Sequence, residues 1–132
     1  MATQTKTNTV LMTGNQAVVK AALAVGADMF SGYPITPTTE ILSEWAKEAE
    51  NNKDLIFLQT EDEPAAGFVM IGGVSMGKKA WTATAGVGNV LMQDPLSMAE
   101  AMRMPTVTYV GQRGGPSTGT VVYSQQELNL TR

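Results

Sequence analysis

The stretch GYPITPTTE, from Gly32 to Glu40, places two prolines around one threonine, between a short apolar run and an amphipathic one. Each proline fixes its own φ and moves the residue before it out of the α region. The stretch therefore predicts a rigid turn that ends a strand and begins a helix at Pro37. Thr36 lies in this turn, where it either caps the helix or contacts a ligand.

An alternation of strands and helices extends from this turn in both directions. Apolar residues at helical spacing predict helices over 14–25, 37–50 and 65–76. A further helix is expected after the turn 85–88, reset at Pro95 with Asp94 as its cap. Strands are expected over 28–33, 55–58, 79–84 and 106–110, and the run 55–58 is apolar enough to be buried. The alternation predicts an α/β domain with a doubly wound parallel sheet covered on both faces.

The composition limits the class of protein. The 132 residues are enough for one domain with a real core, and 43% of them are hydrophobic. A net charge of −3 argues against a nucleic-acid surface. The chain has no cysteine and no histidine, which excludes disulfides, iron–sulfur ligation, zinc sites and histidine-based triads within it.

The terminal residues and the apolar runs suggest a location. The N-terminus, MATQTKTNTV, lacks the apolar region of a signal peptide. No apolar run approaches the roughly 20 residues of a membrane span. We therefore expect a cytoplasmic protein with no membrane contact, a flexible N-terminus over residues 1–8 and one domain over residues 9–132.

Three unusual stretches, YPITP, TEDE and QRGGPSTG, each follow an expected strand. In doubly wound sheets, ligands bind beyond the carboxyl ends of the strands. The acidic cluster 61–63 either stabilises a helix N-terminus or faces a ligand. Arg113 either grips an anion with its guanidinium or lies in a solvated surface loop.

Two glycine-rich stretches do not fit known phosphate sites. GGVSMGKK, from Gly72 to Lys79, has lysine where a P-loop requires serine or threonine, and its glycines end a helix. The GVG of residues 86–88 lacks the third glycine of a dinucleotide fingerprint. It predicts a tight turn.

Taken together, the motifs resemble the alpha subunit of 2-oxoacid:ferredoxin oxidoreductases over roughly residues 9–126. The motifs that carry the resemblance are GN at 14–15, GYPITPTTE at 32–40, EDEPAA at 61–66, TATAGVGNVLM at 82–92 and QRGGPSTG at 112–119. The resemblance implies the thiamine diphosphate-binding fold of the type that holds the cofactor's pyrimidine ring. The chain departs from the family at Ala85–Gly88, commonly Ser-Gly-Pro-Gly, and at Asp94–Pro95, usually an unbroken helix that bears a glutamate.

The resemblance also implies roles for individual residues. Glu63 corresponds to the glutamate that contacts N1′ of the aminopyrimidine, and Thr36 and Arg113 correspond to residues near the substrate. A carboxyl group at N1′ promotes removal of the proton from thiazolium C2. Further cofactor contacts are implied for Tyr33, Pro34, Ile35, Thr36, Gly86 and Gly88. No metal ligand is implied in this chain.

The implied activity is oxidative decarboxylation of a 2-oxoacid with coenzyme A, which gives acyl-CoA, CO₂ and reduced ferredoxin, or the reverse. The resemblance places the diphosphate and Mg²⁺ on a beta subunit and the iron–sulfur clusters on partner chains. It thus predicts a hetero-oligomer, of which this chain is a fragment that is inactive alone. Two alternatives are a domain of another thiamine enzyme and a non-catalytic fragment that binds an anion or a partner.

Overall fold

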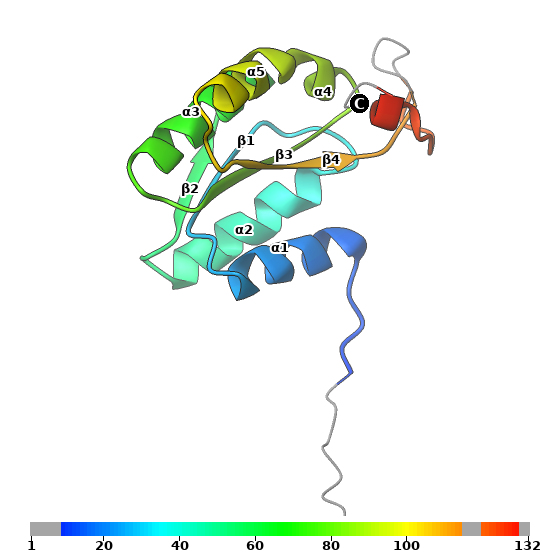
Figure 1. The fold of residues 1–132 in the computed structure, drawn as a ribbon. Coiled ribbons are helices and arrows are strands. Elements are labelled where there is room, and N and C mark those ends of the chain that lie inside the picture. The colour runs from blue at the N-terminus through cyan, green and yellow to red at the C-terminus, as the bar shows by residue number, and fades with distance from the viewer. Residues whose placement is uncertain (1–8, 115–119, 130–132) are drawn as a thin grey trace, which may run out of the picture.

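A computed structural model describes residues 9–114 and 120–129, and the expected flexible N-terminus, residues 1–8, lies outside them. Four parallel strands form one sheet in the order β2-β1-β3-β4 (Figure 1). The strands are β1 (Met29–Gly32), β2 (Ile56–Gln59), β3 (Ala80–Ala85) and β4 (Val107–Gly111). The helices are α1 (Gly14–Ala24), α2 (Thr39–Asn51), α3 (Glu63–Ser75), α4 (Val87–Leu91), α5 (Gln93–Ala101) and the short η1 (Gln126–Asn129).

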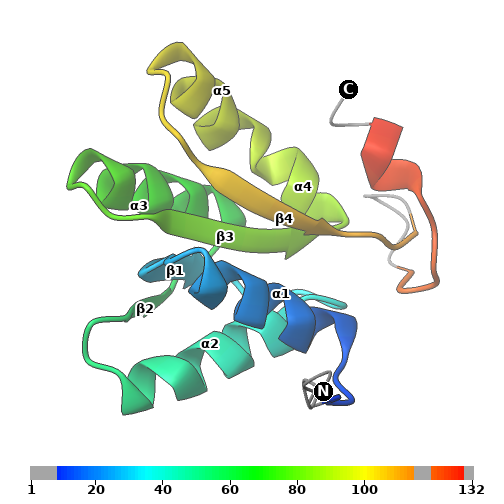
Figure 2. The ribbon, with the colours of Figure 1, turned by 60° about the horizontal axis from the view of Figure 1, so that its bottom comes forward.

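Helices cover both faces of the sheet. Helices α1 and α2 lie on one face, and α3, α4 and α5 lie on the other (Figures 1 and 2). This arrangement confirms the predicted doubly wound parallel sheet. Within the described residues, no helix has the length and apolar character needed to cross a bilayer.

Aromatic side chains form the centre of the core between the sheet and the α1–α2 layer. Phe30 packs edge-on against Trp81, with ring centroids 4.8 Å apart, and Trp81 packs against Trp45 at 5.4 Å. The indole N–H of Trp45 donates to the carbonyl of Ile56 at 3.0 Å, so the buried ring also satisfies its polar atom. This cluster fixes α2 against β1, β2 and β3.

Helix α2 begins at Thr39, two residues after the predicted start at Pro37. Both the amide and the hydroxyl of Thr38 donate to the carbonyl of Ile35, at 2.8 and 3.0 Å. These bonds close a separate turn over residues 35–38 before the helix starts. Thr38 occupies the N-cap position, and the possible role of Thr36 as the cap is therefore wrong.

The prediction that Asp94 caps a helix starting at Pro95 is also wrong. The break lies at Met92, and Asp94 and Pro95 are the second and third residues of α5. A proline is tolerated there because the first N–H groups of a helix have no partner within it. Pro95 packs so closely against Gly67 of α3 that a Cβ there would lie 2.6 Å from the Cβ of Pro95.

Strand β2 is less buried than its apolar sequence predicts. Ile56 and Leu58 are exposed, because β2 is an edge strand and its outer side has no neighbouring strand among the described residues. Phe57, on the opposite face, stacks parallel to Phe30.

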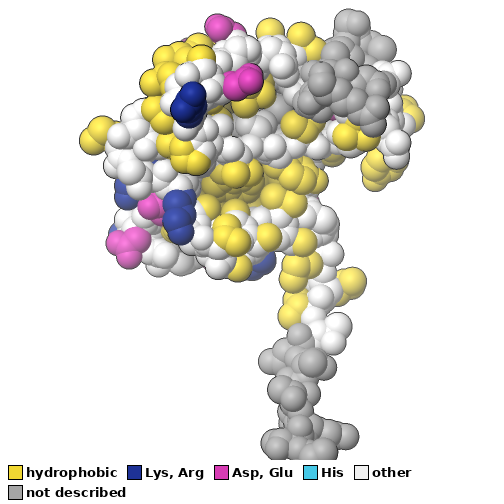
Figure 3. Space-filling model, viewed as in Figure 1, with side chains coloured by type: hydrophobic (Ala, Val, Ile, Leu, Met, Phe, Trp, Pro, Cys, Tyr) yellow, Lys and Arg dark blue, Asp and Glu magenta, His cyan; other side chains and the backbone are white. Residues whose placement is uncertain are grey.

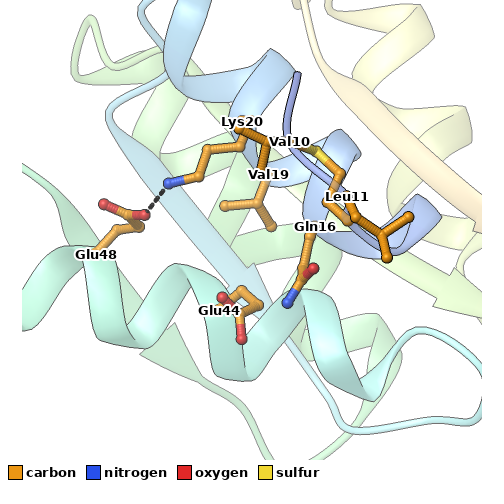
Figure 4. Close-up of a pocket in the computed structure, with 8 residues that line it drawn as sticks. Val10, Leu11, Gln16, Val19, Lys20, Glu44 and Glu48 are labelled. Carbon is orange, nitrogen blue, oxygen red and sulfur yellow. Dashed lines mark hydrogen bonds and ion pairs between the residues drawn. The ribbon is translucent and has the colours of Figure 1, made fainter. Parts of the chain in front are cut away.

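Two cavities lie away from the carboxyl edge of the sheet. One, of about 200 Å³, lies where α1 and α2 meet the segment 10–12 and includes the Lys20–Glu48 ion pair (Figure 4). The other is an open apolar groove of about 700 Å³ between α1 and the adjacent face of β3 and β4, seen as a hollow lined by hydrophobic side chains (Figure 3). Neither cavity is lined by a residue predicted for the site.

Candidate active site

The segments that follow the four strands bring the predicted site residues to one edge of the sheet. Residues 33–36 follow β1, Glu63 follows β2, residues 86–88 follow β3 and Arg113 follows β4. Since all four strands are parallel, their carboxyl ends lie at the same edge. The sequence elements YPITP, EDE, GVG and QRG are therefore neighbours in the fold. The rest of the QRGGPSTG stretch, residues 115–119, lies outside the described residues.

Within the acidic cluster, the structure distinguishes Glu63 from the two residues before it. Glu61 and Asp62 are exposed, whereas Glu63 is only 5% exposed. Asp62 is the N-cap of α3 and accepts a hydrogen bond from the amide of Ala65 at 2.7 Å. Because Asp62 already performs the capping, the Glu63 carboxylate is not needed for it.

The Glu63 carboxylate has no hydrogen bond or ion pair with any residue in the described part of the chain. It lies against Gly88, where a Cβ would be 2.7 Å from Oε1 of Glu63 and would overlap the hydroxyl of Thr84. The Thr84 hydroxyl is also buried and, within the same ranges, has no hydrogen-bond partner. The Glu63 carboxylate thus keeps its acceptor capacity at a nearly buried position, so this arrangement fits a ligand that brings a donor.

Arg113 joins the loop after β4 to the loop after β1. Its Nη1 donates to the carbonyl of Thr36 at 3.1 Å, across 77 residues of sequence. The guanidinium lies directly over Gly86, which has a φ of 53° and where any Cβ would overlap Nε. That Nε is buried and, in the part of the chain described, has no hydrogen-bond partner. The guanidinium has five N–H donors, so beyond the bond to Thr36 its terminal N–H groups keep donor capacity for an anion.

The turn that carries Thr36 is braced from α1. The side-chain amide of Asn15 donates to the carbonyl of Pro37 at 2.9 Å, and the hydroxyl of Thr13 donates to Glu40 at 2.9 Å. The peptide bond between Thr36 and Pro37 is cis. The Thr36 side chain is exposed, as is that of Tyr33, while Pro34 and Ile35 are half-buried.

One buried acid at this edge, Glu127, is absent from the predicted site. Its side chain has no exposed surface. Its Oε1 accepts hydrogen bonds from the backbone amides of Gly86 and Arg113, and its Oε2 accepts from the amide of Arg113, all at 3.1 Å. In the sequence, Glu127 is a single acidic residue in a polar segment, and nothing around it indicates burial.

The described ranges contain no group of three or more histidine, cysteine, aspartate or glutamate residues that could hold a metal ion. The groups at the edge include two buried glutamates, Glu63 and Glu127, the guanidinium of Arg113, hydroxyl groups and backbone amides.

Comparison with known proteins identifies the family. Residues 20–132 match the family described as pyruvate flavodoxin/ferredoxin oxidoreductase, thiamine diphosphate-binding. The chain belongs to this family. The match confirms the predicted resemblance and the thiamine diphosphate-binding type of fold.

Individual members of the pyruvate flavodoxin/ferredoxin oxidoreductase family are similar over most of the chain. The 2-oxoglutarate synthase subunit KorA of Methanocaldococcus jannaschii is 43% identical over 87% of this chain and 31% of its own length. The pyruvate synthase subunit PorA of the same organism is 35% identical over 78% of this chain and 27% of its own length. The chain thus spans less than a third of the length of these relatives.

A solved structure of the same kind has a similar fold. The 2-oxoglutarate:ferredoxin oxidoreductase from Magnetococcus marinus, with 2-oxoglutarate, coenzyme A and succinyl-CoA bound, superposes with a TM-score of 0.77. It is 39% identical to this chain, and the match covers 83% of this chain and 19% of that one.

Proposed function

We propose that this chain holds the aminopyrimidine half of thiamine diphosphate in the alpha subunit of a 2-oxoacid:ferredoxin oxidoreductase. The observation that carries the proposal is Glu63, a residue only 5% exposed at the carboxyl edge, whose carboxylate has no partner among the described residues. N1′ of the aminopyrimidine ring, when protonated, is a donor of the kind that this carboxylate lacks. The residues present therefore fit the cofactor.

Glu63 would hold a proton between its carboxylate and N1′ of the ring. When bound, thiamine diphosphate supplies the centre that stabilises the carbanion formed in decarboxylation. Glu63 would keep N1′ protonated, and the low exposure of the residue would limit the water that competes for that proton. Cofactor contacts are proposed for the turn after β1 and the turn after β3: Tyr33, Pro34, Ile35, Thr36, Gly86 and Gly88.

Arg113 and Thr36 would bind the carboxylate of the 2-oxoacid. The bond from Nη1 to the carbonyl of Thr36 orients the planar guanidinium, and its remaining terminal N–H groups would bind a carboxylate oxygen. Thr36 would add its exposed hydroxyl as a second donor. A charge and a neutral donor from two separate loops can then fix the substrate's position and orientation.

The complete reaction needs further protein. We infer that the reaction is oxidative decarboxylation of a 2-oxoacid with coenzyme A to acyl-CoA and CO₂, with the electrons passed to ferredoxin, or the reverse. A beta subunit would hold the diphosphate and Mg²⁺. This chain has no cysteine, so the iron–sulfur clusters would lie on partner chains that do. The relatives are named as subunits of such enzymes, which supports a hetero-oligomer. We also propose a cytoplasmic location for the protein.

The test of this proposal is the substitution Glu63→Gln in the complete enzyme. Glutamine keeps the shape of the side chain but does not hold the proton at N1′. We expect turnover of the 2-oxoacid to fall by about 10²- to 10⁴-fold. Exchange of the thiazolium C2 proton for deuterium, followed by NMR, should slow to a similar extent without any substrate present.

Glu61→Gln is the matched control, because Glu61 is an exposed member of the same acidic cluster. We expect it to leave both the turnover and the C2 exchange rate near those of the parent enzyme. A large loss with Glu61→Gln and none with Glu63→Gln would contradict the assignment.

A further inference from the structure

We infer that Glu127 is a positioning residue, which sets the place of Arg113 over the turn after β3. This inference rests on the proposed function, because it concerns how the guanidinium is held for a 2-oxoacid carboxylate. Glu127 would not touch the substrate or the cofactor. It would act through the backbone of two loops that follow neighbouring strands.

The carboxylate of Glu127 joins these two loops directly. Oε1 accepts from the amide of Gly86, 41 residues earlier in the sequence, and from the amide of Arg113. Oε2 accepts from the amide of Arg113 as well, so one carboxylate binds both loops with all three distances at 3.1 Å. Hydrogen bonds to an ionised acceptor are about twice as strong as neutral ones, and this carboxylate is fully buried.

The position of the two backbone amides decides where the guanidinium lies. The side chain of Arg113 crosses over Gly86, which has no Cβ and so permits this close approach. At the far side of Gly86, the guanidinium reaches the carbonyl of Thr36. If the loop after β4 moved away from the turn after β3, this path over Gly86 would be lost. Glu127 holds the two loops at the required separation.

The segment that carries Glu127 is itself folded back toward the loop after β4. The amide of Gly114 donates to the carbonyl of Val122 at 2.7 Å, which joins residue 122 to the end of the loop after β4. Helix η1 then presents Glu127 at the sheet edge. The only carboxylate in the described part of this segment is thus placed against Arg113, the second residue of the QRGGPSTG stretch.

A double-mutant cycle in the complete enzyme tests this inference. Arg113→Ala alone should lower kcat/KM for the 2-oxoacid by about ten- to a hundredfold. Glu127→Ala should lower it by up to about a hundredfold, mainly through a higher KM, since a misplaced binding group weakens substrate positioning. In the Arg113→Ala enzyme, Glu127→Ala should cost no more than about twofold further. The dissociation constant of thiamine diphosphate should change little.

Two further variants control for folding. Gln126→Ala, an exposed neighbour in η1, should leave kcat/KM and KM unchanged. If Glu127→Ala does not assemble with its partner subunits, the test uses Glu127→Gln instead. Glutamine keeps one of the two acceptor oxygens of Glu127 and replaces the other with an NH₂ group, so it is the milder change. The glutamine variant should raise KM by about threefold to tenfold, and this rise too should disappear in the Arg113→Ala enzyme.

The results separate this inference from the proposed function. An unchanged kcat/KM with Arg113→Ala would remove the substrate role of Arg113, and the inference with it. A loss with Arg113→Ala but none with either Glu127 variant would overturn the inference alone. Equal losses from Glu127→Ala in the presence and absence of Arg113, or a loss that follows weaker cofactor binding, would overturn it as well.

Discussion

At Gly88, the missing side chain leaves room for the carboxylate of Glu63. A Cβ at this position would lie 2.7 Å from Oε1 of Glu63 and would overlap the hydroxyl of Thr84. We expect Gly88→Ala to displace the carboxylate and to lower kcat of the complete enzyme by about 10²-fold, because a shift of about 1 Å can cost this much. Steady-state kinetics, with circular dichroism to check the fold, would measure the effect.

Gly72→Ala is the control for this substitution, since a Cβ at Gly72 meets no atom within 4 Å and no proposed site residue. We expect its kcat to equal that of the parent. If Gly88→Ala were as active as Gly72→Ala, the close packing around Glu63 would have no catalytic importance.

At the residue scale, the sequence points to the acidic cluster 61–63 but not to Glu127. The cluster follows a strand and precedes a helix of small residues, a pattern of neighbours in the chain, and the resemblance to the family then selects Glu63 within it. The burial of Glu127 depends on the amides of Gly86 and Arg113, which are 41 and 14 residues away. No local pattern records such partners, so only the folded chain shows this acid as part of the site.

At the scale of the element, α3 contains two adjacent glycines whose surroundings differ. Gly72 faces open space, whereas a Cβ at Gly73 would lie 3.1 Å from the Cβ of Ala80 in β3 and would overlap the sulfur of Met29 in β1. We expect Gly72→Ala to stabilise the fold by about 0.5–1 kcal/mol, since alanine favours a helix. Gly73→Ala should destabilise it by about 1–3 kcal/mol through overpacking.

Urea unfolding of the 132-residue chain would measure both changes in stability. A shift of the two midpoints in the same direction would show that α3 does not pack on β1 and β3 as described.

The sequence predicts the elements better than it predicts where two of the helices begin. Apolar runs and glycine stops locate all four strands, because burial requires those residues whatever the tertiary detail. The start of α2 is missed because Thr38 donates to the carbonyl of Ile35 and closes a separate turn. Such a turn and an earlier helix start would both satisfy the backbone, and the sequence alone does not choose between them. The start of α5 is missed because Pro95 is placed by its packing against Gly67, on another helix.

At the scale of the whole molecule, we predict that the isolated chain does not oxidise a 2-oxoacid. It has no cysteine for an iron–sulfur cluster, and the site described here lies at an open edge of one sheet. The purified chain, incubated with pyruvate or 2-oxoglutarate, coenzyme A, thiamine diphosphate, Mg²⁺ and an artificial electron acceptor, should form no acyl-CoA. Addition of a beta-type subunit and the remaining alpha-subunit domains should restore the activity. Turnover by the chain alone would refute the proposal that it holds only the aminopyrimidine half of the thiamine diphosphate site.

The parallel sheet delivers each proposed function on a separate loop: the turn with Thr36 follows β1, Glu63 follows β2 and Arg113 follows β4. The residue proposed to hold the proton, Glu63, and the residue proposed to bind the substrate carboxylate, Arg113, are therefore encoded in different parts of the gene. A lineage that changes the loop after β4 can adapt to a new acid while Glu63 and its surroundings are inherited unaltered. The same fold can in this way serve enzymes that use different 2-oxoacids, provided that each new loop still allows the Arg113 side chain to pack over Gly86.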